Sequence, residues 1–303
     1  MQPVRRMDGF TLIEAIMAIM ITGIVGAMVA VFIKSPIDAY TSAARRAQLT
    51  DVADTALRRI GRDIRVALPN SVRNPTNGVD QCLEFMPTKI GGRYRVAQTA
   101  TGTGNILDFT AEDGAFDMLW LNSALGTNEI KTGDIVVVYN DGYTGNAYLG
   151  TNAIRVKQVA NNSSETPPTA TITFVDADNS EKPFQLKRLP AESPSYRFQV
   201  VPAGAQIVSY ACVGNTLMRY ARTLTSANNS DGWAHPATCN DMTSGASSSA
   251  TLANGLTRCS LRYQPPGSGT GAGRQGIVSM ILEATREGEA VQLYHQVNVS
   301  NTP

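Results

Sequence analysis

The sequence predicts an α+β fold in which a long N-terminal helix packs on antiparallel β-sheet. Three observations support this prediction. Residues 10–33 are almost continuously apolar, residues 43–68 repeat apolar side chains every three or four positions, and the chain after Asn70 changes to the alternating pattern of strands. The 303 residues suffice for one large domain or two small ones.

Residues 10–33 form a segment of membrane-spanning length. These 24 residues extend about 36 Å as a helix, and the hydrocarbon core of a bilayer is about 30 Å thick. Arg5 and Arg6 precede the segment, so the positive-inside rule predicts a cytoplasmic leader and export of the remainder. Small residues are scattered through the run, so we do not expect a secretory cleavage site after it. The predicted parts are therefore a leader (1–9), a transmembrane and assembly helix (10–35), an amphipathic half of that helix (36–69) and an exported β-rich globular domain (70–303).

A single carboxylate, Glu14, lies near the start of the apolar run. A carboxylate inside bilayer hydrocarbon costs a few kcal/mol. Glu14 either lies near the interface, where it is tolerated, or meets a cation during assembly. Cleavage between Gly9 and Phe10 would create such a cation, the α-amino group of Phe10, and charge-assisted bonds are strong where the dielectric constant is low.

The segment GFTLIEAIMAIMITGIVGAMVAVFI resembles the processing and membrane segment of type IV prepilins and type II secretion pseudopilins. The resemblance implies that a prepilin peptidase cuts between Gly9 and Phe10 and N-methylates Phe10. It also implies that Glu14 neutralises the N-terminal amine of a neighbouring filament subunit. Since the pseudopilin at the very tip of secretion filaments typically lacks this Glu, a subunit stacked against another is implied. The sequence MDG before the cut departs from the basic or Gln residue common in the family.

This resemblance also implies a set of partners and locations. The partners are the prepilin peptidase, other minor and major pilins, the inner-membrane assembly platform, and membrane lipid before assembly. The protein would reside in the bacterial inner membrane with a periplasmic globular domain, and then in a pilus or pseudopilus at the cell surface. The formal net charge of +1 gives no reason to expect a nucleic-acid partner.

The amphipathic half of the helix has two distinct faces. We expect Pro36 to kink it, since proline removes an intrahelical bond, and Pro69 with Asn70 to end it. The apolar face comprises Leu49, Val52, Ala53, Ala56, Leu57, Ile60, Ile64, Ala67 and Leu68. On the polar face, Arg58, Arg62 and Arg65 could grip phosphates. Acidic residues are interleaved with them and no aromatic stripe accompanies them, which favours a solvated or subunit-contacting face.

Longer stretches resemble one group of minor pilins. AARRAQLTDVADTALRRIGRDIRVALPNSVR, CLEFMP, GGRYR and the C-terminal VQLYHQVNVSNTP are similar to the MshO family of the mannose-sensitive haemagglutinin (MSHA) pilus. That family is of the same broad type as the type II secretion pseudopilin J. The resemblance implies a minor pilin that takes part in initiating pilus assembly near the tip. The alternatives are a type II secretion minor pseudopilin, or a tip adhesin whose loop 225–256 presents Trp233 to carbohydrate or another surface.

Ten segments after Asn70 are predicted to form strands. They are CLEFMP, DIVVVYN, AIRVKQVA, ATITFV, YRFQVV, QIVSYACV, TLMRYA, TRCSLRYQ, IVSMILEA and AVQLYHQVNV. Turns are predicted at 140–142 and 213–215, and polar loops at 99–115 and 225–256. We expect this antiparallel sheet to cover the apolar face of the helix.

The four cysteines indicate two disulfides in an exported chain. They are Cys82, Cys212, Cys239 and Cys259, and no C-x-x-C spacing occurs. Three pairings are possible. We favour Cys82–Cys212 with Cys239–Cys259, because the second pair would hold a long loop.

The remaining motifs do not indicate an enzyme. GAGRQG at 271–276 lies where a dinucleotide fingerprint would need a following helix, and a strand is predicted there instead. Asp176, Asp178 and Glu181 are a weak calcium candidate within a stretch that reads as a polar turn. His235 and His295 have no evident nucleophile partner. We therefore expect a protein without enzymatic activity and, apart from that calcium candidate, without a cofactor.

Overall fold

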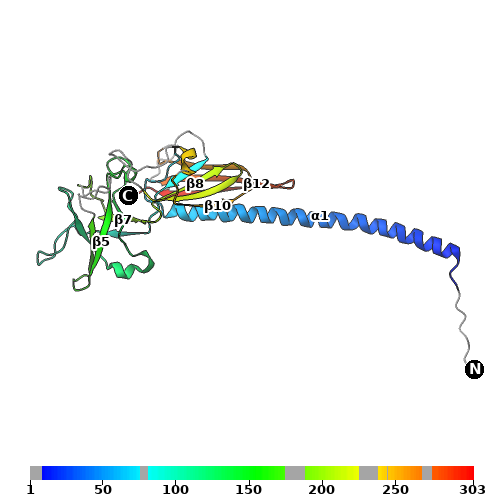
Figure 1. Ribbon diagram of the computed structural model, residues 1–303, viewed down its shortest axis with the longest axis horizontal. Helices are drawn as coiled ribbons and strands as arrows, with labels where there is room; N and C mark the ends of the chain where they lie inside the picture. The colour runs from blue at the N-terminus through cyan, green and yellow to red at the C-terminus, as the bar shows by residue number, and fades with distance from the viewer. Residues whose placement is uncertain (1–8, 76–80, 175–187, 225–237, 244, 268–274) are drawn as a thin grey trace, which may run out of the picture.

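The computed structural model describes residues 9–75, 81–174, 188–224, 238–243, 245–267 and 275–303. It confirms the predicted α+β layout, with antiparallel sheets packed on a long N-terminal helix. This helix, α1 (Leu12–Arg65), is 54 residues long. Its first half projects alone and its second half lies against the sheets (Figure 1). Such a layout is consistent with a pilin-like fold.

The course of α1 corrects one detail of the sequence prediction. The helix continues through Pro36. It ends at Arg65, before the predicted end at Leu68. Ala67 forms a β-bridge with Pro87, and the Leu68 N–H donates to the Met86 carbonyl at 2.8 Å. The last predicted turn is therefore lost because a neighbouring extended segment satisfies its backbone groups.

Two antiparallel sheets and the second half of α1 form a proximal lobe. One sheet has the order β1–β8–β9–β10 and the other β11–β12–β13. Their bounds are β1 (Cys82–Phe85), β8 (Ile207–Val213), β9 (Thr216–Arg222), β10 (Ser248–Ala253), β11 (Leu256–Gln264), β12 (Gln275–Arg286) and β13 (Glu289–Ser300). The buried helix residues are those on the predicted apolar face, namely Ala53, Ala56, Leu57, Ile60 and Ile64, joined by Gly61. They pack on alternate residues of β12, as the period of two requires.

A second, distal lobe is inserted between β1 and β8. It is one six-stranded antiparallel sheet of order β2–β7–β4–β5–β6–β3. The strands are β2 (Ile90–Arg93), β3 (Ala115–Met118), β4 (Ile135–Val138), β5 (Ala153–Asn162), β6 (Thr169–Phe174) and β7 (Arg197–Val201). Its aromatic core includes Tyr94, Phe116, Phe174 and Phe198. The lobe lies beyond the C-terminal end of α1, opposite the apolar segment (Figure 1).

All ten predicted strand segments contain a strand, and three strands were not predicted. β2 has the sequence IGGR, β3 is only four residues long, and β10 is SSATLA with mostly exposed side chains. These strands lack the apolar alternation on which the prediction relied, and β10 lies in the predicted loop 225–256. Three short 3-10 helices complete the described elements: η1 (Asn122–Asn128), η2 (Ala147–Leu149) and η3 (Cys239–Thr243).

The two lobes are joined by a shared core and a hydrogen-bonded segment after α1. Leu68 and Met86 pack with Ile135, Val201 and Ile207, which come from both lobes. The side chain of Asn70 donates to the Asn140 carbonyl at 2.7 Å, and Asn140 donates to the Pro69 carbonyl at 2.6 Å. Asn70 also bonds to Asn301 near the C-terminus. The end of α1 is thereby fixed to the distal lobe.

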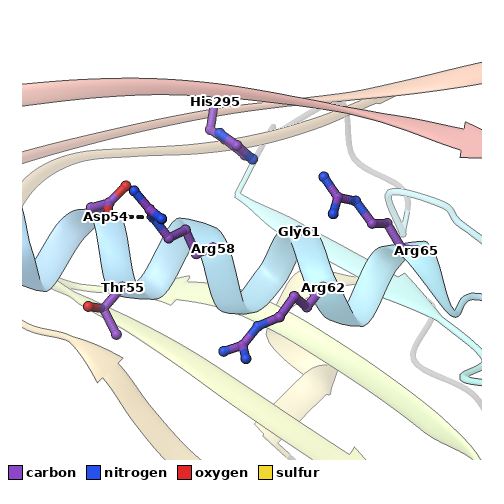
Figure 2. Close-up of a pocket in the computed structure, with 7 residues that line it drawn as sticks. All are labelled: Asp54, Thr55, Arg58, Gly61, Arg62, Arg65 and His295. Atoms are coloured by element: carbon purple, nitrogen blue, oxygen red, sulfur yellow. Dashed lines mark ion pairs between the residues drawn. The ribbon is translucent and has the colours of Figure 1, made fainter.

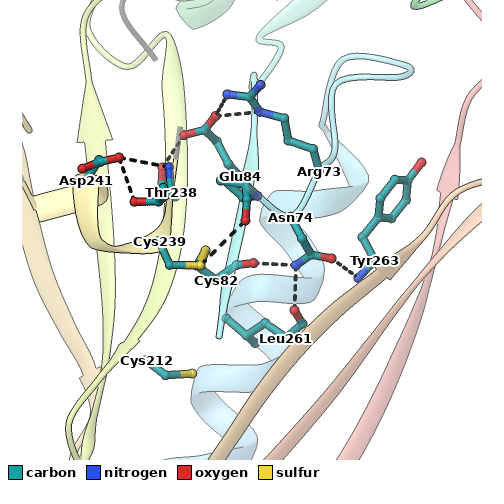
Figure 3. Close-up of a disulfide and its surroundings, with 12 residues drawn as sticks. Arg73, Asn74, Cys82, Glu84, Cys212, Thr238, Cys239, Asp241, Leu261 and Tyr263 are labelled. Atoms are coloured by element: carbon teal, nitrogen blue, oxygen red, sulfur yellow. Dashed lines mark hydrogen bonds and ion pairs between the residues drawn. A yellow bond between two sulfur atoms is a disulfide. The ribbon is translucent and has the colours of Figure 1, made fainter. Parts of the chain in front are cut away.

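A buried ion pair lies close to this junction. Arg73 donates two hydrogen bonds to the fully buried Glu84, at 3.0 and 2.6 Å (Figure 3). The Arg73 guanidinium also lies 4.0 Å above the ring of Tyr148. Burial raises the pKa of the Glu84 carboxyl, while Arg73 and a hydrogen bond from Ser209 act against that shift. The pair joins the segment after α1 to the proximal sheet.

Replacing Arg73 is expected to destabilise the fold strongly. Arg73→Leu leaves the Glu84 carboxylate buried without its cation, so the free energy of unfolding should fall by about 3 kcal/mol. Arg58→Leu is the matched control, because it breaks the exposed pair with Asp54 and should cost less than about 1 kcal/mol. Urea unfolding of the detergent-solubilised full chain measures both. Equal losses in the two variants would contradict the assigned burial of Glu84.

The disulfides correct the favoured pairing. Cys82 pairs with Cys239 and Cys212 with Cys259, with Cα atoms 5.6 and 6.0 Å apart. Both distances suit a disulfide. Cys212 on β8 and Cys259 on β11 connect the two proximal sheets, which sequence spacing does not show. Asn74 reinforces the contact between the two sheets: its side chain donates to the Cys82 carbonyl on β1 and to the Leu261 carbonyl on β11, and it accepts from the Tyr263 N–H (Figure 3).

Candidate functional site

The peptide bond between Gly9 and Phe10 is fully accessible. No heavy atom lies within 4 Å of a Cβ position built on Gly9, and 82% of Phe10 is exposed. Both residues precede the first residue of α1, so the bond lies outside the hydrogen-bonded helix. A peptidase therefore meets no obstruction from the described part of the chain.

Glu14 lies in the first turn of α1. Thr11 is the N-cap, and its side-chain hydroxyl accepts from the Glu14 N–H at 3.4 Å. An N-cap followed by a first-turn carboxylate suits the partial positive charge of a helix N-terminus. Among the described residues, Glu14 has no ion-pair partner within 4.0 Å. Its carboxylate is therefore free to meet a cation from outside the chain.

The helix around Glu14 exposes a large apolar surface. The exposed apolar residues include Phe10, Leu12, Ile13, Ile16, Met17, Ile19, Met20, Ile21, Ile24, Val25, Met28, Val29, Val31, Phe32 and Ile33. None of the most apolar window is buried by the chain, and α1 is long and apolar enough to cross a membrane. A patch of this size is unfavourable in water, so an apolar environment outside the chain must cover it.

The N-terminal segment matches one known family motif. Residues 4–30 match the model of the prokaryotic N-terminal methylation motif. This match supports a type IV prepilin-like or pseudopilin-like protein. It also supports processing by a prepilin peptidase, and together with the exposed helix it supports membrane anchoring. No curated protein and no solved structure matches the chain.

A second polar feature lies between α1 and β13. A groove of about 690 Å³ is lined by Asp54, Thr55, Arg58, Gly61, Arg62, Arg65 and His295. Figure 2 shows Arg58 and Arg65 on the side of α1 that faces His295, with Gly61 between them. A Cβ on Gly61 would lie 3.3 Å from His295 Nε2, so the glycine is what lets β13 approach the helix. A smaller groove lined by Arg65, Gln296, Val297 and Asn298 adjoins it.

The sequence predicted only part of this groove. It placed Arg58, Arg62 and Arg65 on one helix face, and it placed His295 in a strand without a partner. The approach of β13 to α1 places His295 on the side of the helix that carries Arg58 and Arg65, whereas Arg62 lines the groove from the other side of α1 (Figure 2). Gly61, in the middle of an amphipathic helix, was the available signal, since a helical glycine often marks a close contact.

Several candidate residues lie outside the described residues. They are Asp176, Asp178 and Glu181 of the calcium candidate, together with Trp233 and His235. Within the described ranges, no group of three His, Cys, Asp or Glu side chains could hold a metal ion. The stretch after GAGRQG is strand β12, so the helix that a dinucleotide fingerprint requires does not follow it.

Proposed function

We propose that this protein is a minor type IV pilin of the MSHA type, similar to the MshO family, that takes part in initiating pilus assembly near the pilus tip. It acts by assembly, has no enzymatic activity and needs no cofactor for that role. Its partners are the prepilin peptidase, other minor and major pilins and the inner-membrane assembly platform.

The position of the distal lobe is the main observation in favour of a subunit near the pilus tip. The lobe lies beyond the C-terminal end of α1, on the far side from the apolar segment (Figure 1). In a filament whose helices run side by side toward the membrane, the C-terminal ends of the helices point away from the cell. A lobe of six strands at that end occupies space that the next subunit would need. The subunit therefore suits the end of a filament better than its interior.

Glu14 favours correct registration of the assembled subunits. Once the leader is removed, each mature chain carries an α-amino group at Phe10. Pairing of that group with the Glu14 carboxylate of an adjacent subunit offsets the cost of placing each charge in an apolar helix bundle. A subunit displaced along the bundle leaves both charges unpaired, so the paired register is favoured.

The disulfides support a periplasmic location for the globular part. Both bridges lie in the part of the chain after the apolar segment, and disulfides persist in oxidising compartments such as the bacterial periplasm. The basic leader then remains cytoplasmic, and the chain crosses the inner membrane once before it enters the pilus.

Counting surface pili tests the proposal. The gene is deleted in its host and restored with the wild type or with Glu14→Ala, and pili are counted by electron microscopy. We expect the deletion to remove most pili and the wild type to restore them. Glu14→Ala should restore about tenfold fewer, because the loss of one buried charge pair is worth at least about 1.4 kcal/mol. Equal amounts of the two proteins in the membrane fraction show that insertion is intact.

Two other outcomes would point elsewhere. Normal pili with impaired exoprotein release would indicate a minor pseudopilin of type II secretion, which the methylation motif supports equally. Normal pili with impaired adhesion after deletion of residues 225–256 would indicate a tip adhesin. Full rescue by Glu14→Ala would exclude the pairing of Glu14 with a neighbouring amine.

A further inference from the structure

The arginines of α1 fall into two groups. Arg45 pairs with Glu287 at 2.6 Å and Arg46 with Glu289 at 2.9 Å, both at the β12–β13 turn, and Arg58 pairs with Asp54 at 2.6 Å. In contrast, Arg59, Arg62 and Arg65 have no carboxylate within 4.0 Å among the residues that the structure describes. The positive charge left without a partner is therefore concentrated in the last two turns of the helix.

The acidic residue of these turns is already engaged. Asp63 accepts hydrogen bonds from Tyr210 at 2.5 Å and from Arg219 at 3.1 Å, which bind α1 to strands β8 and β9. Asp63 is thus unavailable to Arg62 and Arg65. The groove between α1 and β13 keeps a net positive lining, with Arg62, Arg65 and the half-buried His295 around it.

We propose that this groove receives an acidic segment of a neighbouring pilin subunit, whose carboxylates pair with Arg62 and Arg65. The inference rests on the proposed assembly function and names one contact surface for it. Arginine guanidinium groups favour carboxylates because both are planar and can form two hydrogen bonds. The smaller groove lined by Arg65, Gln296, Val297 and Asn298 extends this surface along β13.

The position of the groove disfavours two other anionic partners. Arg62 lies 29 residues beyond Ile33, so about 43 Å of helix separates it from the end of the apolar segment, several times the Debye length at physiological salt. Lipid headgroups are too far away to fill the groove. A nucleic acid would gain little stacking on its bases, because no Phe, Tyr or Trp is among the lining residues.

Charge reversal with a matched control tests the inference. Arg62→Glu/Arg65→Glu is compared with Arg93→Glu/Arg197→Glu, which changes the net charge equally at an exposed pair of neighbouring residues on β2 and β7. In the full-length protein in its host, we expect the groove variant to enter filaments about tenfold less, because attraction is replaced by repulsion. The control should enter normally. Arg62→Gln/Arg65→Gln, which avoids new acidic groups at the helix end, should show a smaller loss in the same direction.

A photo-crosslinker at Thr55, an exposed residue of the groove lining, identifies the occupant. In filaments, we expect crosslinks to an Asp- or Glu-bearing peptide of another pilin, and their loss in the charge-reversed variant. The same crosslinker at Tyr143, which is exposed on the distal lobe, is the control. Crosslinks to phospholipid, to nucleic acid or to a pilin peptide without acidic residues would overturn the inference. So would normal filament entry of both arginine variants.

Glu14→Ala in the same assay separates the two hypotheses. If Glu14→Ala lowers filament entry while the arginine variants enter normally, the groove inference fails and the proposed assembly function stands. If Glu14→Ala enters normally, the assembly pairing fails, and with it the basis of this inference.

Discussion

Gly9→Leu is expected to leave nearly all of the protein with its leader attached. The N-terminal methylation motif supports cleavage by a prepilin peptidase, and Gly9 is the residue before the expected cut. Glycine leaves open space around the bond, whereas a leucine side chain would have to fit between the bond and the enzyme. Mass spectrometry of the N-terminal peptide measures the fraction that begins at a methylated Phe10.

The uncut protein should also be absent from filaments. Arg5 and Arg6 would remain attached to the apolar helix, and each arginine costs about 2.5–3.5 kcal/mol at the centre of a bilayer. Moving the uncut, charged leader out of the cytoplasm and into the membrane is therefore unfavourable. We expect filament entry of the uncut protein to fall about 100-fold or more. Met7→Leu, which puts the same side chain two residues earlier, should be cut and assembled normally. Filaments that contain uncut Gly9→Leu protein would contradict this account of the leader.

Removing the Cys82–Cys239 bridge is expected to be the most destabilising single change in the globular part. The bridge closes a loop with a sequence separation of 157, and the Cys212–Cys259 bridge one of 47. In the chain-entropy model a loop of the first length contributes roughly 5 kcal/mol, and measured losses are typically about 2–5 kcal/mol. Cys82→Ala/Cys239→Ala should therefore lower the free energy of unfolding by about 4 kcal/mol, measured by urea unfolding of the full chain in detergent.

The second bridge is the matched control. Cys212→Ala/Cys259→Ala should cost about 1 kcal/mol less than the first pair, since the shorter loop loses less entropy. Peptide mapping of the wild type without reduction gives an independent check. We expect Cys82 linked to Cys239, and a peptide that links Cys82 to Cys212 would contradict the pairing in the structure. A larger loss for the shorter loop would show that native packing outweighs loop entropy here.

The amino-acid sequence determined those features that depend on local pattern. The predicted processing segment, with Gly9, Phe10 and Glu14, lies within one short stretch of the chain, and the family match at residues 4–30 supports the motif. The apolar face of α1 and the ten predicted strand segments also follow from periodicity, because a helix repeats every 3.6 residues and a strand every two. Where that alternation was missing, as in β2, β3 and β10, the strand was missed.

The tertiary structure alone decided which distant segments meet. The distal lobe of six strands is inserted between β1 and β8. It therefore contacts the segment at the end of α1 and does not lie along the helix. The disulfide pairing also depends on tertiary contacts: Cys82 on β1 bonds to Cys239 on η3, and Cys212 on β8 bonds to Cys259 on β11 of the other proximal sheet. Likewise, His295 reaches Arg58 and Arg65 only because β13 lies over Gly61. Contacts between residues far apart in the chain depend on the order of strands in the sheets, and local periodicity contains no information about that order.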